Sequence, residues 1–195
     1  MPKYSIGIDE AGRGPLAGSV FVSAVACLEG LDIKGLLPGV ADSKTLSADK
    51  RLLIYNQARF LEKKGVLKIS RSFSRSRFID QWGISLAIRS ALERSLSRLD
   101  ISPSNCHVLL DGSLKAPDCY QNQETIIKGD QLIPLISLAS IVAKVSRDKQ
   151  ITRLAKKYPR YNLEIHKGYG TLNHRLLIKE FGPSPVHRRS FCRNI

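Results

Sequence analysis

At three separate places in this chain, a short apolar run ends in acidic residues. Asp9 and Glu10 follow the alternating run 4–8, Asp111 follows the run 107–110, and Asp130 comes shortly after the run 125–127. Runs of this length and composition are typical of strands, and strand ends meet at the edge of a sheet where ligand sites form. The pattern therefore predicts a sheet that gathers carboxylates from distant parts of the sequence at one edge.

The remaining segments alternate between strand-like and helical spacing. Further strands are predicted at residues 19–28 and 66–72, and helices at residues 47–64, 84–99, 138–145 and 175–181. The third of these helices either continues or restarts through residue 158. Strands interleaved with helices indicate an α/β fold, and the early strands favour a mixed sheet. A length of 195 residues suits one domain, 1–195.

The charge balance indicates a polyanionic partner. The chain has 31 Lys and Arg residues against 17 Asp and Glu residues, which gives a formal net charge of +14. Such a surface attracts nucleic acid, although a merely cationic protein or one that meets anionic lipid would show the same balance. Apolar residues make up 43% of the chain and charged residues 25%, which fits a packed core and argues against disorder.

The cysteines and the first residues bear on location. No C-x-x-C pair is formed by the four cysteines, Cys27, Cys106, Cys119 and Cys192, and a reduced compartment fits them. The start Met1-Pro2-Lys3 lacks the apolar stretch of a signal peptide, and no segment reaches the ~20 apolar residues of a membrane span. We therefore expect a cytoplasmic protein that makes no membrane contact.

The acidic residues at the strand ends are candidate metal ligands. Asp9 and Glu10 are adjacent, so sharing one site would require the chain to leave strand geometry there. Clustered carboxylates repel one another unless a divalent cation joins them, and oxygen ligands select Mg²⁺ or Mn²⁺. Two such ions roughly 3.5–4 Å apart can activate water and stabilise the leaving oxygen of a phosphodiester. The alternative is that each acid is an ordinary turn or cap residue.

A glycine-rich stretch follows the first acidic pair. Gly12, Gly14 and Gly18 have the spacing G-x-G-x-x-x-G, which differs from the dinucleotide-binding pattern G-x-G-x-x-G. The preceding acids would also repel a pyrophosphate, so a dinucleotide-dependent oxidoreductase is disfavoured. The stretch is either a plain turn or a place where the backbone approaches a ribose 2′-hydroxyl while Arg13 holds a phosphate.

Four further features are compatible with nucleic-acid contact. Ser43 and Lys44 place a hydroxyl and an ammonium side by side, as a phosphate contact requires. Tyr169 lies between two glycines and either presents its ring to a sugar or base or is a partly buried surface residue. The run 187–191 is basic and lies near the C-terminus, but it is also compatible with a solvated tail. Residues 59–98, with ten basic and three acidic residues, form either a face for a duplex backbone or a solvated surface.

Taken together, these motifs resemble those of type 2 ribonuclease H, or ribonuclease HII, in its bacterial form. The resemblance spans residues 7–191, and its core, GIDEAGRGP at residues 7–15, is highly specific. Six further motifs follow in the family's order: DSKTL at 42–46, LDG at 110–112, IKGD at 127–130, ASIVAKVSRD at 139–148, HKGYGT at 166–171 and HRRSF at 187–191.

The resemblance implies a ribonuclease H-like fold, in which helices flank a mixed five-stranded sheet and the C-terminal part is small and helical. It implies hydrolysis of the RNA strand of RNA–DNA hybrids. It also implies cleavage on the 5′ side of a single ribonucleotide embedded in duplex DNA, by a two-metal mechanism that leaves a 5′-phosphate and a 3′-hydroxyl. Both kinds of duplex are thus expected partners, and we expect the protein to act as a monomer.

The resemblance also implies roles for individual residues. The catalytic, metal-binding carboxylates are Asp9, Glu10, Asp111 and Asp130. The 2′-hydroxyl at the junction is read by Gly12, Arg13 and Gly14, and Tyr169 packs on the adjacent sugar and helps to bind that hydroxyl. Residues from about 160 onward form a C-terminal segment that contacts the substrate.

Asp148 is the competing choice for the fourth carboxylate, but Lys144 stands four residues before it as a surface partner, so Asp130 is preferred.

The sequence IDQWGI at 79–84 departs from the family, which more often has Leu-Asn before the Ile. This departure bears on local packing and not on chemistry. The chain stops at Ile195 and shows no extra N-terminal domain, which disfavours the longer type 3 relatives. It also shows no C-terminal extension of the kind that could carry a sliding-clamp motif. A non-catalytic basic RNA-binding protein is the remaining alternative, and it gives the acids no role.

Overall fold

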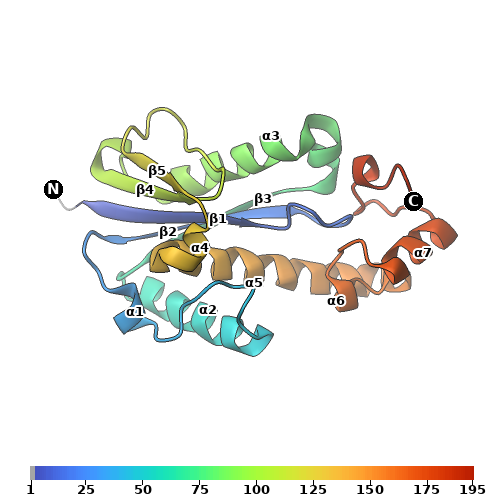
Figure 1. Cartoon of the computed structure of the whole chain (residues 1–195), viewed down its shortest axis with the longest axis horizontal. Coiled ribbons are helices and arrows are strands. Elements are labelled where there is room, and N and C mark those ends of the chain that lie inside the picture. The colour runs from blue at the N-terminus through green and yellow to red at the C-terminus, as the bar shows by residue number, and fades with distance from the viewer. Residues whose placement is uncertain (1–2) are drawn as a thin grey trace.

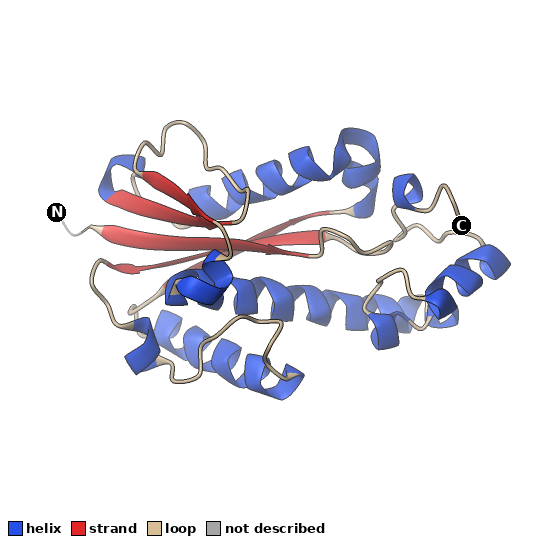
Figure 2. Cartoon of the chain, in the orientation of Figure 1, coloured by secondary structure: helices blue, strands red, loops and turns tan. Residues whose placement is uncertain are grey.

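The computed structural model describes residues 3–195, and its centre is one mixed sheet of five strands (Figures 1 and 2). The strands are β1 (Tyr4–Ala11), β2 (Val20–Leu28), β3 (Lys68–Ser74), β4 (Cys106–Asp111) and β5 (Gln123–Ile126). Their order is β3-β2-β1-β4-β5; β2 pairs antiparallel with β1 and β3, whereas β4 pairs parallel with β1 and β5. The predicted mixed five-stranded sheet is confirmed. The first two residues of the start Met1-Pro2-Lys3, where we expected no signal peptide, lie outside the described residues.

Helices cover both faces of the sheet and extend past one end of it. The helices are α1 (Ile33–Leu36), α2 (Ala48–Lys63), α3 (Ser76–Ser97), α4 (Gly129–Leu132), α5 (Pro134–Lys157), α6 (Leu163–His166) and α7 (Leu172–Phe181). Figure 1 shows α3 on one face, α5 and α2 on the other, and the C-terminal helices beside the far end of α5. Within the described residues, none of these helices is long and apolar enough to span a bilayer.

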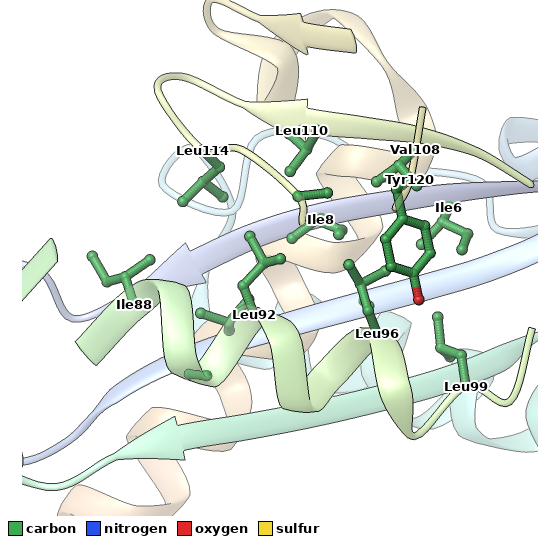
Figure 3. Close-up of a cluster of buried hydrophobic side chains, with 14 of the residues drawn as sticks. Ile6, Ile8, Ile88, Leu92, Leu96, Leu99, Val108, Leu110, Leu114 and Tyr120 are labelled. Atoms are coloured by element: carbon green, nitrogen blue, oxygen red, sulfur yellow. The ribbon is translucent and has the colours of Figure 1, made fainter. Parts of the chain in front are cut away.

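Two layers of apolar packing hold the sheet. On one face, Ile6 and Ile8 of β1 pack with Leu92 and Leu96 of α3 (Figure 3). On the other face, α5 approaches β1 so closely that a Cβ on Gly7 would lie 2.5 Å from the backbone carbonyl of Leu135. Because side chains alternate along a strand, Gly7 faces α5 while its neighbours fill the opposite core. The start of α5 is thereby fixed against the strand that carries Asp9.

Three expectations about the elements need revision or completion. The helix predicted from residue 84 begins at Ser76, with a break at Gly83, whose φ of 81° is the left-handed conformation that glycine tolerates. The helix at 138–145 is continuous through Lys157. The apolar run 125–127 is only partly a strand: β5 ends at Ile126 and is an edge strand with a largely exposed pattern, and Ile127, which follows it, is 77% exposed.

Candidate active site

Three carboxylates that are far apart in sequence lie together at one edge of the sheet. Asp9 comes from β1, Asp111 ends the parallel neighbour β4, and Asp130 lies on α4. One carboxylate oxygen from each lies within 4.8 Å of the others, and the peptide nitrogen of Asp130 donates to Asp111 Oδ1 at 3.2 Å. We call these three residues the acidic cluster. Parallel pairing of β1 with β4 is what brings the two strand ends together.

Glu10 lies beside the acidic cluster and not within it. The chain keeps strand geometry through Ala11, with Glu10 paired to Val22, so its side chain leaves the opposite face of the strand from Asp9. Its carboxylate accepts from Arg13 Nε at 3.0 Å. Burial raises the pKa of Glu10, Arg13 lowers it, and Asp111 is close enough to raise it further. The role of Glu10 as a fourth ligand stays a prediction.

Electrostatics in the acidic cluster favour a bound cation. Burial raises the pKa of Asp9 well above its ordinary value, and repulsion from Glu10 and Asp111 adds to this effect, while a hydrogen bond from Ser140 opposes it. Burial also raises the pKa of Asp111, and the charge of Asp130 contributes. Deprotonated oxygens so close together are stabilised by a hard divalent ion. The donor set therefore fits Mg²⁺ or Mn²⁺.

The segment that contains Ser43 and Lys44 meets the acidic cluster. The Asp42 carboxylate accepts from the peptide nitrogen of Lys44 at 2.9 Å and so shapes the turn. Lys44 Nζ reaches Asp130 Oδ2 at 3.1 Å, a bond that raises the pKa of the lysine. Ser43 is buried instead, and its hydroxyl pairs with Ser140 Oγ at 2.8 Å. The predicted contact between Ser43 and a phosphate thus finds no exposed hydroxyl, and Ser43 supports Ser140.

The glycine loop, residues 12–18, is held in place by hydrogen bonds from the buried side chain of Arg188. The Arg188 guanidinium donates to the carbonyl oxygens of Gly12 at 2.6 Å, Arg13 at 2.8 Å and Gly18 at 3.0 Å. Gly12 has a φ of 95°, and a Cβ there would overlap Arg147. The interpretation of residues 187–191 as a solvated tail is therefore wrong, because Arg188 is fully buried and makes three bonds to the glycine loop.

The tyrosine loop, residues 166–171, lies directly against the glycine loop. The peptide nitrogen of Leu16 donates to Gly168 O at 2.8 Å, and Arg147 Nη2 donates to Lys167 O at 2.8 Å. The Arg147 guanidinium carbon lies 5.5 Å from the centre of the Tyr169 ring, which is 46% exposed. Arg147 therefore contacts both loops, with its side chain against Gly12 and its guanidinium near the ring of Tyr169.

Sequence reasoning assigned no role to Ser140, Arg147 or Arg188. Ser140 carried a weak signal, since it interrupts the apolar face of a helix whose neighbouring positions 138, 141 and 142 are aliphatic. The two arginines carried none, because a buried arginine looks like a surface one in sequence. Residues 59–98 do not form one basic face, since α2 and α3 lie on opposite sides of the sheet (Figure 1).

Asp148 lies outside the acidic cluster, as expected. Its Oδ1 accepts from Lys144 Nζ at 2.9 Å, which is the i−4 pairing anticipated from the sequence. Among the described residues, the group of acids whose oxygens could share one ion contains Asp130 and omits Asp148.

Known proteins match this chain over almost its whole length. The family model for ribonuclease HII matches residues 6–194. A ribonuclease HII of Caldicellulosiruptor bescii is 41% identical, over 99% of this chain and 88% of the relative. The structure of the PCNA–ribonuclease HII complex from Archaeoglobus fulgidus contains a chain with a TM-score of 0.79 and 23% identity, covering 98% of this chain and 95% of that one. A Bst ribonuclease HIII in complex with Mn²⁺ has a TM-score of 0.69 and 18% identity, covering 97% of this chain and 65% of that one.

The fold, the acidic cluster and these relatives define a metal-dependent endoribonuclease of the ribonuclease H type. Within that class, the chain belongs to the ribonuclease HII family. It acts on RNA–DNA hybrids, as the family does, and its acidic cluster offers the ligands for a divalent metal ion. This assignment replaces both alternatives, the non-catalytic RNA-binding protein and the dinucleotide-dependent oxidoreductase.

Proposed function

We propose that this enzyme hydrolyses the RNA strand of RNA–DNA hybrids and also cuts on the 5′ side of a single ribonucleotide in duplex DNA. The products carry a 5′-phosphate and a 3′-hydroxyl. The observation that carries the proposal is the position of the glycine loop: it begins one residue after the strand that holds Asp9 and Glu10. A ribose whose 2′-hydroxyl bonds the backbone of Gly12 to Gly14 would place its 5′ phosphate next to the carboxylates.

The residues of the chain divide the work between holding ions and holding substrate. Asp9, Asp111 and Asp130, with Glu10 beside them, would hold two divalent ions, Mg²⁺ or Mn²⁺. When bound, these ions supply water activation and charge stabilisation at the leaving oxygen. Ser140 lies close enough to Asp9 to lower its pKa, and Ser43 in turn holds Ser140 through a hydrogen bond between their hydroxyls.

Substrate contacts come from two loops and one lysine. The proposal assigns the 2′-hydroxyl to residues 12–14, with Tyr169 packed on the neighbouring sugar. Lys44 is exposed at its ammonium end and is free to exchange Asp130 for a phosphate. Residues from about 160 onward form the substrate-contacting segment of the single domain.

We further propose that the protein is a cytoplasmic monomer. Its four cysteines carry free thiols, as a reduced compartment would allow.

A cleavage-site map on a duplex with one embedded ribonucleotide tests the proposal. With Mg²⁺, we expect one cut on the 5′ side of the ribonucleotide, none in the matching all-DNA duplex, and none after chelation. Asp9→Asn should lower the rate by roughly 10³-fold or more, since several kcal/mol of transition-state stabilisation is lost, while duplex binding largely survives. Asp118→Asn is the control, because its exposed carboxylate pairs with Lys115 outside the acidic cluster. A cut on the 3′ side, or full activity of Asp9→Asn, would refute the proposal.

A further inference from the structure

Three buried histidines lie in or next to the tyrosine loop and have no part in the proposed chemistry. His166, His174 and His187 come from three different segments of the C-terminal part. The rings of His166 and His174 stack with their centres 4.0 Å apart, and His174 meets His187 through their Nε2 atoms at 3.0 Å. His174 is 0% exposed and His187 2%. Buried rings with this many polar contacts must satisfy each ring nitrogen in a defined way.

The protons in this group can be placed from one fixed donor. The peptide N–H of Ser184 can only donate, and it points at His187 Nδ1 at 3.0 Å, so that nitrogen carries no proton. Neutral His187 therefore has its proton on Nε2, from which it donates to His174 Nε2. His174 must then carry its proton on Nδ1, which donates to the carbonyl oxygen of Tyr169 at 2.9 Å. The bonds form a directed chain that ends on Tyr169.

His166 obeys the same logic in the adjacent ring. The peptide nitrogen of Gly168 donates to His166 Nδ1 at 3.2 Å, which leaves the proton on Nε2 to donate to Tyr161 O at 2.8 Å. Burial lowers the pKa of all three rings, and the pKa values of His174 and His187 fall to about 4. The neutral forms that the directed chain requires are thus the stable ones at neutral pH.

We propose that His187 and His174 are positioning residues that fix the Tyr169 backbone, and through it the direction of the exposed Tyr169 ring. We call the bonds from Ser184 through both rings to Tyr169 the histidine relay. This inference rests on the proposed function, because the contact between Tyr169 and a ribose sugar is part of that function.

The histidine relay does more than fill space, because His174 makes hydrogen bonds to both Tyr169 and His187. An apolar residue at position 174 would fill the space but leave the carbonyl oxygen of Tyr169 and the Nε2 proton of His187 without this partner. Gly168 and Gly170 flank Tyr169, and Gly168 has a φ of 80°. Backbone bonds within the loop, from Tyr169 N to His166 O and from Thr171 N to Tyr169 O at 2.9 Å each, fix part of its course, and the relay adds a bond to Tyr169 O from a side chain outside the loop.

A spectroscopic test judges the relay without using activity. Long-range ¹H–¹⁵N correlation of the imidazoles at pH 7 should show three neutral rings, with the proton on Nδ1 in His174 and on Nε2 in His166 and His187. An Nε2 proton on His174, or a charged ring at pH 7, would overturn the relay.

A kinetic test judges the consequence for the substrate. His174→Leu removes the bond to Tyr169, whereas in His174→Asn the amide nitrogen can take the place of Nδ1 and keep it. We expect His174→Leu to lower kcat/KM on the single-ribonucleotide duplex about tenfold more than on a long hybrid, and His174→Asn to restore much of that ratio. His107→Gln, which alters a histidine on β4 outside the relay, should leave the ratio unchanged. Circular dichroism confirms that each variant folds.

The outcomes separate the relay from the function on which it rests. Wrong tautomers together with a strong effect of Tyr169→Ala on the single-ribonucleotide duplex would refute the relay alone. Correct tautomers with no effect of Tyr169→Ala would refute the role of Tyr169 in the proposed function, and the positioning role with it. An equal loss in His174→Leu and His174→Asn on both substrates would show a purely structural role and overturn the proposal.

Discussion

At the scale of single residues, Lys44 is the cation that balances the acidic cluster from within the chain. Its ammonium contacts Asp130, and that contact competes with any ion bound there. We predict that Lys44→Met increases the affinity for Mg²⁺ by up to about fivefold, since an ion pair whose lysine is exposed contributes up to ~1 kcal/mol. Calorimetric titration of Mg²⁺ measures this, with Lys115→Met as the matched control because Lys115 pairs with Asp118. Equal or weaker affinity in Lys44→Met would contradict the competition.

Residues differ in how far the sequence could predict their place. Asp9, Asp111 and Asp130 were predictable to lie together, because each comes after a strand-like apolar run in the sequence and the ends of neighbouring parallel strands share an edge. The buried positions of Ser43 and Arg188 were not. Burial of a polar side chain depends on partners from elsewhere in the chain: Ser140 for Ser43, and three carbonyl oxygens of the glycine loop for Arg188.

At the scale of elements, the approach of α5 to β1 is the contact that fixes the site. Gly7→Ala would place a methyl group 2.5 Å from the backbone of Leu135, so α5 must move away from the sheet. We predict a loss of about 1–3 kcal/mol or more in the free energy of unfolding, by the usual effect of overpacking. Gly14→Ala is the control for stability, since nothing lies within 4 Å of the added carbon. Urea unfolding of both variants measures the difference, and equal midpoints would argue against the close contact.

Element boundaries followed from the sequence where a single pattern dominated. Apolar runs and helical spacing located β1, β2 and α2, and they located the middle of α5, although this helix extends from Pro134 to Lys157, beyond the predicted 138–145. They failed for the start of α3, where Gly83 interrupts the apolar spacing and hides the preceding turns. They also failed for the one-turn helices α1, α4 and α6, which are too short to show a period.

At the scale of the whole molecule, the fold places a small acidic site on a strongly basic protein. The chain has a formal net charge of +14, yet Asp9, Asp111 and Asp130 gather at one sheet edge, and the buried Arg147 and Arg188 lie against the two loops beside it. A polyanion is attracted by the surface as a whole, whereas the acidic cluster accepts it only where a cation intervenes. The C-terminal part supports the site, since His174 and Arg188 hold the two loops that flank the acidic cluster.

The buried histidines make the stability of the molecule depend on pH. Because the pKa values of folded His174 and His187 lie at about 4, below the ordinary 6.5, the unfolded chain binds more protons between these values. Their contribution to stability is complete above pH 6.5 and is lost as the pH falls toward 4. The raised pKa values of Asp9, Glu10 and Asp111 act with the opposite sign.

A comparison with His187→Gln isolates the histidine contribution, since the carboxylates are common to both proteins and cancel in the difference. We predict that the wild type is more stable than this variant at pH 7.5 and that the difference shrinks by about 2 kcal/mol on going to pH 4.5. Urea unfolding at half-unit pH steps, with metal chelated throughout, measures it. A difference that stays constant over this range would mean that His187 does not resist protonation in the folded protein, and the neutral histidine relay would then lack its basis.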